Sequence, residues 1–221
     1  MKRVQVISPK NQQKRLLARA FWDSEGYPFD KYLFMDECTV VLGRFHIFAG
    51  ISYFGATDIL IWPSKARMNS AFYCAHNLKD IVIPAKSLFP GGIFQLAQVI
   101  FFFIRMLVKQ LPKFQDNHKC HVSFDTLEYL KNHEINTYDW PPQSPEFNPI
   151  EFVWRDLKAY IAENSPSSLA ALRNLIEVFW EQRVTPQYCR LVIEHAKNNV
   201  KKSFDGLNHE KDDATDKLYQ K

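Results

Sequence analysis

The hydrophobic positions in the first third of the chain predict strands followed by a helix. Residues 32–42 and 45–62 are rich in β-branched and aromatic side chains, which is typical of strands. Gly43 and Gly55 interrupt these runs, so we expect three short antiparallel strands joined by tight turns. From Met68 the apolar residues recur at helical spacing, which predicts a helix. Its expected buried face contains Phe72, Ala75, Leu78, Ile81 and Val82.

The middle and the end of the chain predict further strands and helices. Residues 113–117 and 136–140 form short runs typical of strands, and Ser123 is placed to cap a helix between them. Two more helices are predicted at residues 168–183 and 186–202.

A rigid loop precedes another amphipathic helix. Residues 141–149 contain four prolines, which restrict the backbone and argue against a flexible linker. Asn148 is placed as the N-cap and Pro149 as the first helical residue. The expected buried face of this helix contains Ile150, Val153, Trp154, Leu157 and Ile161.

The first and last segments of the chain are polar. Residues 1–30 are predicted to form a basic linker helix that starts at Ser8 and Pro9, and the first twenty residues include no acidic side chain. The basic side chains expected to contact DNA phosphates here are Lys14, Arg15 and Arg19. Residues 203–221 are polar enough to predict a disordered tail.

Composition narrows the classes of protein. With 46% hydrophobic and 14% aromatic residues in 221, the chain can bury one sizeable core. No glycine-rich phosphate loop occurs, so we expect no nucleotide cofactor. The four cysteines are far apart, which favours reduced thiols. Polar side chains interrupt the apolar residues 93–111, so we expect no membrane span.

Three carboxylates stand where predicted elements begin or end. They are Asp36, Asp116 and Glu151. If the strands with the two aspartates are neighbours, the three groups converge and repel one another, and a divalent cation relieves that repulsion. Oxygen ligands favour Mg²⁺ or Mn²⁺, and two such ions can promote phosphodiester cleavage.

Simpler explanations exist for each carboxylate taken alone. Glu151 could complete a capping box with Asn148, and Asp116 could belong to a turn. Glu37 is an alternative metal ligand to Asp36 in the first strand.

The motifs around these carboxylates resemble a known family. WPPQSPEFNPIE at residues 140–151, continued by FVWRDLK at residues 152–158, looks like the last motif of Tc/mariner-type DDE transposases. FQDNHKCH at residues 114–121 resembles their middle motif and FMDECTV at residues 34–40 their first. AGISYFGAT at residues 49–57 resembles the strand that follows. The 34 residues between Asp116 and Glu151 (151 − 116 − 1) match the interval of the Tc branch.

This resemblance implies a fold, a reaction and a location. The fold is α/β and RNase H-like, a mixed five-stranded sheet flanked by helices, with a C-terminal helical extension. Asp36, Asp116 and Glu151 would form a catalytic triad that binds two Mg²⁺ or Mn²⁺ ions for DNA strand cleavage and transfer in the nucleus. The catalytic domain would cover residues 31–165 and the C-terminal helices residues 166–202.

Other side chains near these motifs are candidates for DNA contact. They are His118, His121, Arg155 and Lys158. For the two histidines the alternative is that they line the carboxylate site. Zinc is not favoured at His118, Cys120 and His121, because no second ligand pair accompanies them. We expect Cys120 to face the core.

The chain also departs from the family pattern. It begins near the linker that follows the family's DNA-reading helix-turn-helix units, and the turn at residues 42–45 replaces a longer excursion. About twenty extra residues precede the middle motif, which predicts an insertion at residues 92–112. Three hypotheses follow: an active transposase domain, an inactive transposon-derived protein that still binds nucleic acid, or an unrelated RNase H-like nuclease or metal-dependent phosphoesterase. Whether the chain forms a homodimer stays open.

Overall fold

The computed structural model describes most of the chain. The described residues are 7–40, 45–63, 68–98, 120–121, 123–141 and 144–216. The strand predicted at residues 113–117 lies outside the described residues. Most of the apolar segment 93–111 also lies outside them.

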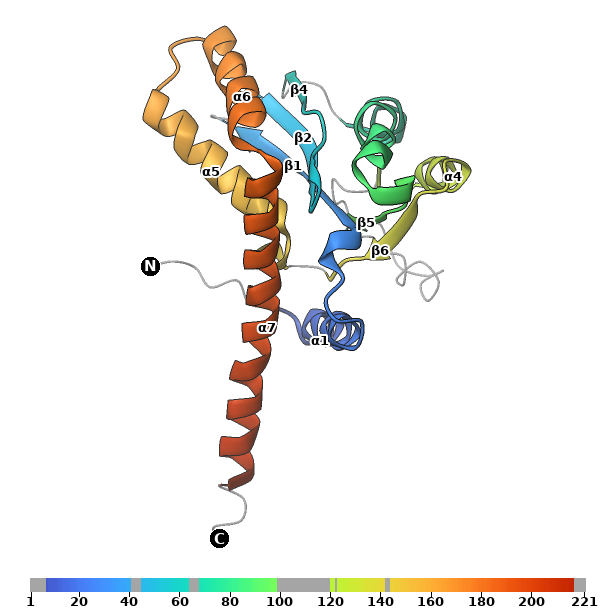
Figure 1. Cartoon of the computed structure of the whole chain (residues 1–221), viewed down its shortest axis with the longest axis vertical. Coiled ribbons are helices and arrows are strands. Elements are labelled where there is room, and N and C mark those ends of the chain that lie inside the picture. Colours follow the sequence, from blue (N-terminus) through green and yellow to red (C-terminus); the bar gives the residue numbers. More distant parts are fainter. Residues whose placement is uncertain are drawn as a thin grey trace.

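A mixed sheet forms the centre of the molecule (Figure 1). Its strands are β1 (Tyr32–Val40), β2 (Phe45–Ser52), β3 (Gly55–Ala56), β4 (Leu60–Pro63), β5 (Gln95–Gln98) and β6 (Asn136–Asp139). The order is β3-β2-β1-β5-β6, and β4 also pairs with β2. β2 runs antiparallel to β1, β3 and β4, whereas β1, β5 and β6 are mutually parallel. The predicted mixed sheet is confirmed, with six strands in five positions because β3 and β4 share one edge of β2.

The parallel strand beside β1 is one that we did not predict. β5 pairs with Tyr32–Phe34 on one side and with β6 on the other, so it occupies an interior position of the sheet. We considered residues 113–117 as a possible neighbour of β1, and we predicted an insertion at residues 92–112. Because β5 is hydrogen-bonded on both sides, residues 95–98 are part of the sheet, and the bounds of the insertion stay a prediction.

Helices cover both faces of the sheet (Figure 1). One face carries α5 (Pro149–Asn164), α6 (Leu169–Arg183) and α7 (Pro186–Asp216). The other face carries η2 (Tyr73–Val82), η3 (Pro84–Leu88) and α4 (Phe124–Asn132). The predicted buried face of α5 is confirmed, since all five of its residues are at most 5% exposed.

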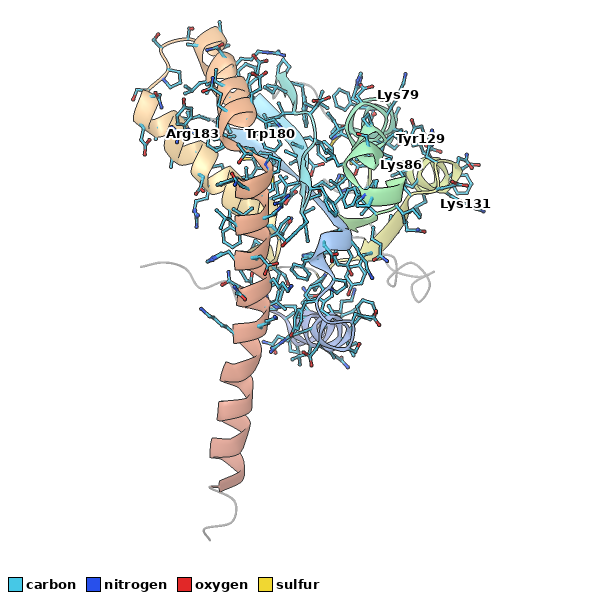
Figure 2. All side chains as sticks on the ribbon, viewed as in Figure 1. Lys79, Lys86, Tyr129, Lys131, Trp180 and Arg183 are labelled. Carbon is cyan, nitrogen blue, oxygen red and sulfur yellow. The ribbon has the colours of Figure 1, made fainter. Side chains whose placement is uncertain are left out.

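Two side-chain hydrogen bonds join helices to neighbouring segments, and Figure 2 labels their donors, Trp180 and Lys86. On one face, Trp180 of α6 donates through Nε1 to the carbonyl oxygen of Thr57 at 2.8 Å. On the other face, Lys86 of η3 donates to the carbonyl oxygen of His133 at 2.7 Å, which ties η3 to the end of α4. The described residues also form three short helices, α2 (Ser70–Phe72), η4 (Pro90–Gly92) and η6 (Pro145–Phe147).

An aromatic cluster joins the first helix to the sheet. α1 (Pro9–Ser24) is capped by Ser8, as predicted, and inserts the fully buried Trp22. The Trp22 ring lies 4.8 Å from Trp140, which follows β6, and 5.4 Å from Phe29 in η1 (Phe29–Lys31), as measured between ring centroids. α1 ends in a left-handed turn in which the Tyr27 amide donates to the Trp22 carbonyl.

The predicted helix after residue 68 is present but is wound more widely. η2 is a π-helix, and its last turn closes with the Ile83 amide donating to the Leu78 carbonyl, five residues earlier. The wider turn rotates successive residues differently from an α-helix. Ala75, predicted to be buried, is therefore exposed, whereas Tyr73 and Asn77 are buried.

The last helix is longer than predicted. α7 continues to Asp216 and projects beyond the body of the molecule (Figure 1), whereas we placed its end at residue 202 and predicted a disordered tail. No proline occurs in residues 187–216, and backbone hydrogen bonds within a helix form without burial of side chains. In the part of the chain that the structure describes, no helix is long and apolar enough to cross a membrane.

We expect Trp22→Ala to destabilise the protein by about 3–5 kcal/mol, because the substitution leaves a cavity among several aromatic rings. Urea unfolding followed by circular dichroism measures the change. Leu17→Ala on the same helix is the control, since Leu17 is 63% exposed and its loss should cost less than about 0.5 kcal/mol. Equal destabilisation by both substitutions would contradict the role of the cluster.

Candidate functional site

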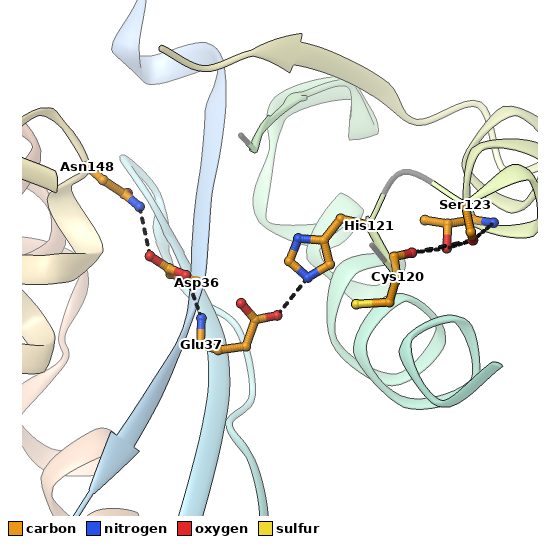
Figure 3. A network of polar contacts seen from close by, with 7 residues as sticks. Asp36, Glu37, Cys120, His121, Ser123 and Asn148 are labelled. Atoms are coloured by element: carbon orange, nitrogen blue, oxygen red, sulfur yellow. Dashed lines mark hydrogen bonds and ion pairs between the residues drawn. The ribbon is translucent and has the colours of Figure 1, made fainter. Parts of the chain in front are cut away.

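Strand β1 delivers two adjacent carboxylates to opposite faces of the sheet. Side chains alternate along a strand, so Asp36 lies on the face of Phe34 and Cys38, which pack in the core beneath α5. Glu37 lies on the face of Met35, which packs in the core with η2 and η3. Figure 3 shows the two side chains pointing away from each other. Of these two candidate ligands, the one that faces α5 is Asp36.

Both carboxylate oxygens of Asp36 accept hydrogen bonds. The backbone N–H of Glu37 donates to Oδ1 at 2.8 Å, and Nδ2 of Asn148 donates to Oδ2 at 3.5 Å (Figure 3). Asn148 is the N-cap residue of α5, as predicted, but its side chain makes no capping hydrogen bond. The capping box that we considered for Glu151 therefore lacks the hydrogen bond that the Asn148 side chain would accept. The amide of Asn148 is turned towards Asp36 instead.

Glu151 contributes a second charge to this face. It lies in the first turn of α5, which packs against β1. Burial raises the pKa of Asp36 well above its ordinary value, and the nearby charges of Glu37 and Glu151 raise it further. The Glu37 amide and the charge of His121 partly oppose this shift. The site thus holds negative charge that its described surroundings do not fully neutralise.

Lys158 lies near the same carboxylates. Burial raises the pKa of the Cys38 thiol, and Lys158 opposes that shift through its charge and a hydrogen bond, so the two side chains are neighbours. Lys158 follows Glu151 by seven residues, about two helical turns, and both therefore lie on the side of α5 that faces β1. Of the predicted DNA-binding residues, Lys158 is the one that the structure brings to the carboxylates.

His121 lies on the other face of the sheet from Asp36. Its Nε2 is 2.9 Å from Oε1 of Glu37, and its ring centroid is 4.5 Å from that of Tyr73. Burial favours the neutral ring, but the charge of Glu37 outweighs this and raises the pKa of His121 to about 10. The His121 side chain is only 9% exposed. We predicted that it would contact DNA, and its burial leaves little surface for such a contact.

The basic residues of α1 are engaged within the protein. Arg15 forms an ion pair with Glu146, and its guanidinium lies 4.7 Å from the centroid of the Phe147 ring. Arg19 is 2% exposed and donates to the carbonyl oxygen of Lys201 in α7 at 3.4 Å. These two side chains hold α1 against η6 and α7, whereas we expected them to face DNA. Lys14 is partly exposed.

Four further residues were singled out in the sequence, and the structure describes two of them. Asp116 and His118 lie outside them. The Arg155 side chain is 67% exposed and forms an ion pair with the neighbouring Asp156. Cys120 is 5% exposed and packs in the core next to η2, as predicted.

The described carboxylates have the chemistry of a divalent-cation site but do not complete one. No group of three or more His, Cys, Asp and Glu side chains able to hold a metal occurs among the described residues. Asp36 and Glu151 nevertheless offer oxygen ligands, and the raised pKa of Asp36 is the electrostatic condition that a bound cation relieves. The donor set fits Mg²⁺ or Mn²⁺ better than it fits zinc.

Sequence reasoning did not foresee two contacts of this site. Asn148 was assigned only to the helix cap, although an asparagine three residues before Glu151 could also reach a neighbouring strand. The contact between Glu37 and His121 joins residues 84 positions apart, and no local pattern indicates such a pair.

Comparison with known proteins finds similarity to transposases over part of the chain. Residues 97–173 match a family described as DDE superfamily endonuclease. The transposable element Tc3 transposase of Caenorhabditis elegans is 39% identical over 69 residues, which cover 30% of this chain and 21% of that protein. The Tc1 transposase of the same organism is 33% identical over 67 residues, which cover 30% and 24%. These alignments thus span about a quarter or less of the length of the two relatives.

Solved structures show the fold. The crystal structure of the catalytic domain of Mos1 mariner transposase matches with a TM-score of 0.68 at 10% identity, covering 89% of this chain and 93% of that chain. A Mos1 transposase paired-end complex with the left transposon end matches with a TM-score of 0.64 at 10% identity, covering 91% and 66%. The predicted RNase H-like fold is confirmed.

Removing the charge of Asp36 should stabilise the protein when no divalent cation is present. An acid whose pKa is raised in the folded state binds its proton more tightly there, so folding stability falls as pH rises above the ordinary value of 3.8. We therefore expect Asp36→Asn to raise Tm at pH 7 in EDTA, by about 2–4 °C for each kcal/mol gained. The gain should shrink as pH approaches 4.

The control for this measurement is Asp58→Asn, because Asp58 is exposed. We expect it to change Tm by less than about 1 °C at either pH. An unchanged or lower Tm for Asp36→Asn at pH 7 would contradict the electrostatic description of the site.

Proposed function

We propose that this chain is a catalytic domain of the Tc/mariner-type DDE transposases and that it cleaves and transfers DNA strands in a divalent-metal-dependent reaction. The observation that supports the proposal is that α5 packs against β1 and brings Glu151 near enough for its charge to raise the pKa of Asp36. A transposon end as partner is supported by the Mos1 complex, which has the same fold.

Three carboxylates would hold the metal ions. They are Asp36, Glu151 and, on the sequence motif alone, Asp116. Two Mg²⁺ or Mn²⁺ ions, when bound, would activate the attacking oxygen and stabilise the leaving oxygen of the phosphodiester. Matching solved structures include the Mos1 catalytic domain with raltegravir and Mn and with raltegravir and Mg, which supports this choice of ions.

The side chains around these carboxylates would orient the reactants. The Glu37 amide and Asn148 hold the Asp36 carboxylate in one orientation between them. Lys158, two turns beyond Glu151 on the same side of α5, is placed to bind a DNA phosphate next to the carboxylates. Arg155 is exposed one turn beyond Glu151 and would add a second phosphate contact.

A second candidate function is an inactive protein that still binds nucleic acid. The observation that favours it is β5, because Gln95–Gln98 already pairs with β1 and 17 residues (116 − 98 − 1) then separate this strand from Asp116. Filter binding of DNA over a salt series, together with the nicking assay below, separates the two functions. Salt-sensitive binding without nicking supports the inactive protein.

We expect the protein to nick supercoiled plasmid DNA in Mg²⁺ or Mn²⁺, and we expect Asp36→Asn and Glu151→Gln each to reduce nicking to background. Gel electrophoresis of the plasmid measures the reaction. Glu128→Gln is the control, since Glu128 is exposed on α4, and it should nick like the parent protein. If the parent and both carboxylate variants nick equally, the activity does not come from this site.

A shortened chain provides a gain-of-function test. In the parallel register, Tyr32 pairs with Gln95 and Phe34 with Ala97, so the residue that follows Gln98 would stand opposite Asp36. Deleting residues 99–115 joins Gln98 directly to Asp116 and places both aspartates on one face of the sheet. We expect this deletion to nick plasmid faster than the parent protein.

The control for the shortened chain is the same deletion with Asp116→Asn. This variant should nick no faster than background, although its fold is the same by circular dichroism. A folded shortened chain that nicks no faster than the parent protein in either ion would show that residues 99–115 do not limit activity.

A further inference from the structure

The Glu37–His121 contact is a buried ion pair on the face of the sheet opposite Asp36. The two side chains are 16% and 9% exposed, and the core around them contains Met35, Phe48 and Tyr73. Transferring two charges from water into such a core costs several kcal/mol per ion, so a pair of this kind adds little stability over apolar side chains of similar size. We therefore look for a role of this pair in the positions of the residues that it joins.

The pair joins two segments that approach the candidate site from different parts of the chain. Glu37 directly follows Asp36, and His121 lies five positions after Asp116. His121 is itself held in place, because Tyr73 stacks on its ring and Thr126 donates to the carbonyl oxygen of Cys120 at 2.5 Å. The ion pair thus connects β1 to residues 120–121, which the hydrogen bond from Thr126 ties to the first turn of α4.

Glu37 acts on Asp36 through its backbone. The N–H of Glu37 donates to Oδ1 of Asp36 at 2.8 Å, while the side chain of the same residue is held by His121 (Figure 3). A rotation of this peptide would move the donor away from the carboxylate. Holding the Glu37 side chain on one face therefore fixes the hydrogen bond that orients Asp36 on the other.

We propose that Glu37 and His121 are positioning residues, whose ion pair fixes the Glu37 peptide against Asp36 and anchors the chain beyond Asp116 to the same strand. Neither side chain touches DNA or metal in this arrangement. The proposal rests on the proposed function for its catalytic consequence, but the orientation of Asp36 is a property of the protein alone and can be measured without metal or DNA.

An apolar replacement of the pair separates positioning from stability. Glu37→Met combined with His121→Phe keeps the packing on Tyr73 and removes both charges, so Tm should stay the same or rise. Hydrogen exchange measured by NMR reports the Glu37 amide directly. We expect this amide to exchange roughly tenfold faster in the double variant, while the Leu157 amide in α5 exchanges as in the parent protein. Unchanged exchange of the Glu37 amide would overturn the proposal.

The second measurement is the Mn²⁺ concentration that gives half of the maximal thermal stabilisation. We expect the double variant to need roughly tenfold more Mn²⁺ than the parent protein, and Glu37→Gln, which can still accept a hydrogen bond from His121, to fall between them. The control is Arg173→Gln, which breaks the exposed Arg173–Glu177 pair on α6 and should leave the midpoint unchanged. A double variant with the parent midpoint would overturn the positioning role in metal binding.

The two proposals fail in distinguishable ways. If Mn²⁺ does not stabilise the parent protein, the metal site of the proposed function is wrong, and the Glu37 amide still decides whether the pair positions Asp36. If the double variant fails to fold, Glu37→Gln carries both measurements. Parent-like amide exchange together with a parent-like Mn²⁺ midpoint in that variant would then overturn the proposal.

Discussion

The alternation of side chains along β1 is the constraint on which the rest of the structure depends. This strand pairs with β2 from Phe34 to Val40 and is covered on both faces, so its successive side chains must point to opposite cores. Asp36 must face α5, and Glu37 must face the opposite core. A shift of one residue in the pairing with β2 would exchange the two carboxylates and bury the wrong one beneath α5. The hydrophobic residues around them hold the register against that exchange.

The second carboxylate depends on how α5 begins. Phe147 and Trp140 belong to the aromatic cluster around Trp22, and the loop between them leads into the helix that carries Glu151. Packing of these large rings determines where the first turn of α5 lies relative to β1. Hydrophobic packing thus sets the distance between Asn148 and Asp36, and the hydrogen bond between their side chains forms at that distance. In this sense the aromatic cluster, although remote from the carboxylates, is part of the machinery that aligns them.

The sequence predicted those features that depend on local patterns. The caps at Ser8 and Ser123, the entry to α5 at Asn148 and Pro149, and the buried face of α5 follow from spacing and residue type alone, and all are present. The π-helical winding of η2 depends on how its residues pack against β2, and the identity of the strand beside β1 depends on long-range pairing. The burial of Arg19 likewise depends on α7, which is distant in sequence. Such features arise from tertiary contacts that no short window of residues contains.

The contact between Arg19 and the carbonyl of Lys201 has a consequence for the order of folding. It joins residues 182 positions apart, and closing so long a loop costs more conformational entropy than any of the strand pairings near the start of the sheet. During synthesis α7 emerges after the sheet and the other described helices, so Arg19 meets this partner only after those elements have been made. Until then the guanidinium of Arg19 stays hydrated, and α1 can be held by its aromatic contacts and by the ion pair of Arg15 with Glu146.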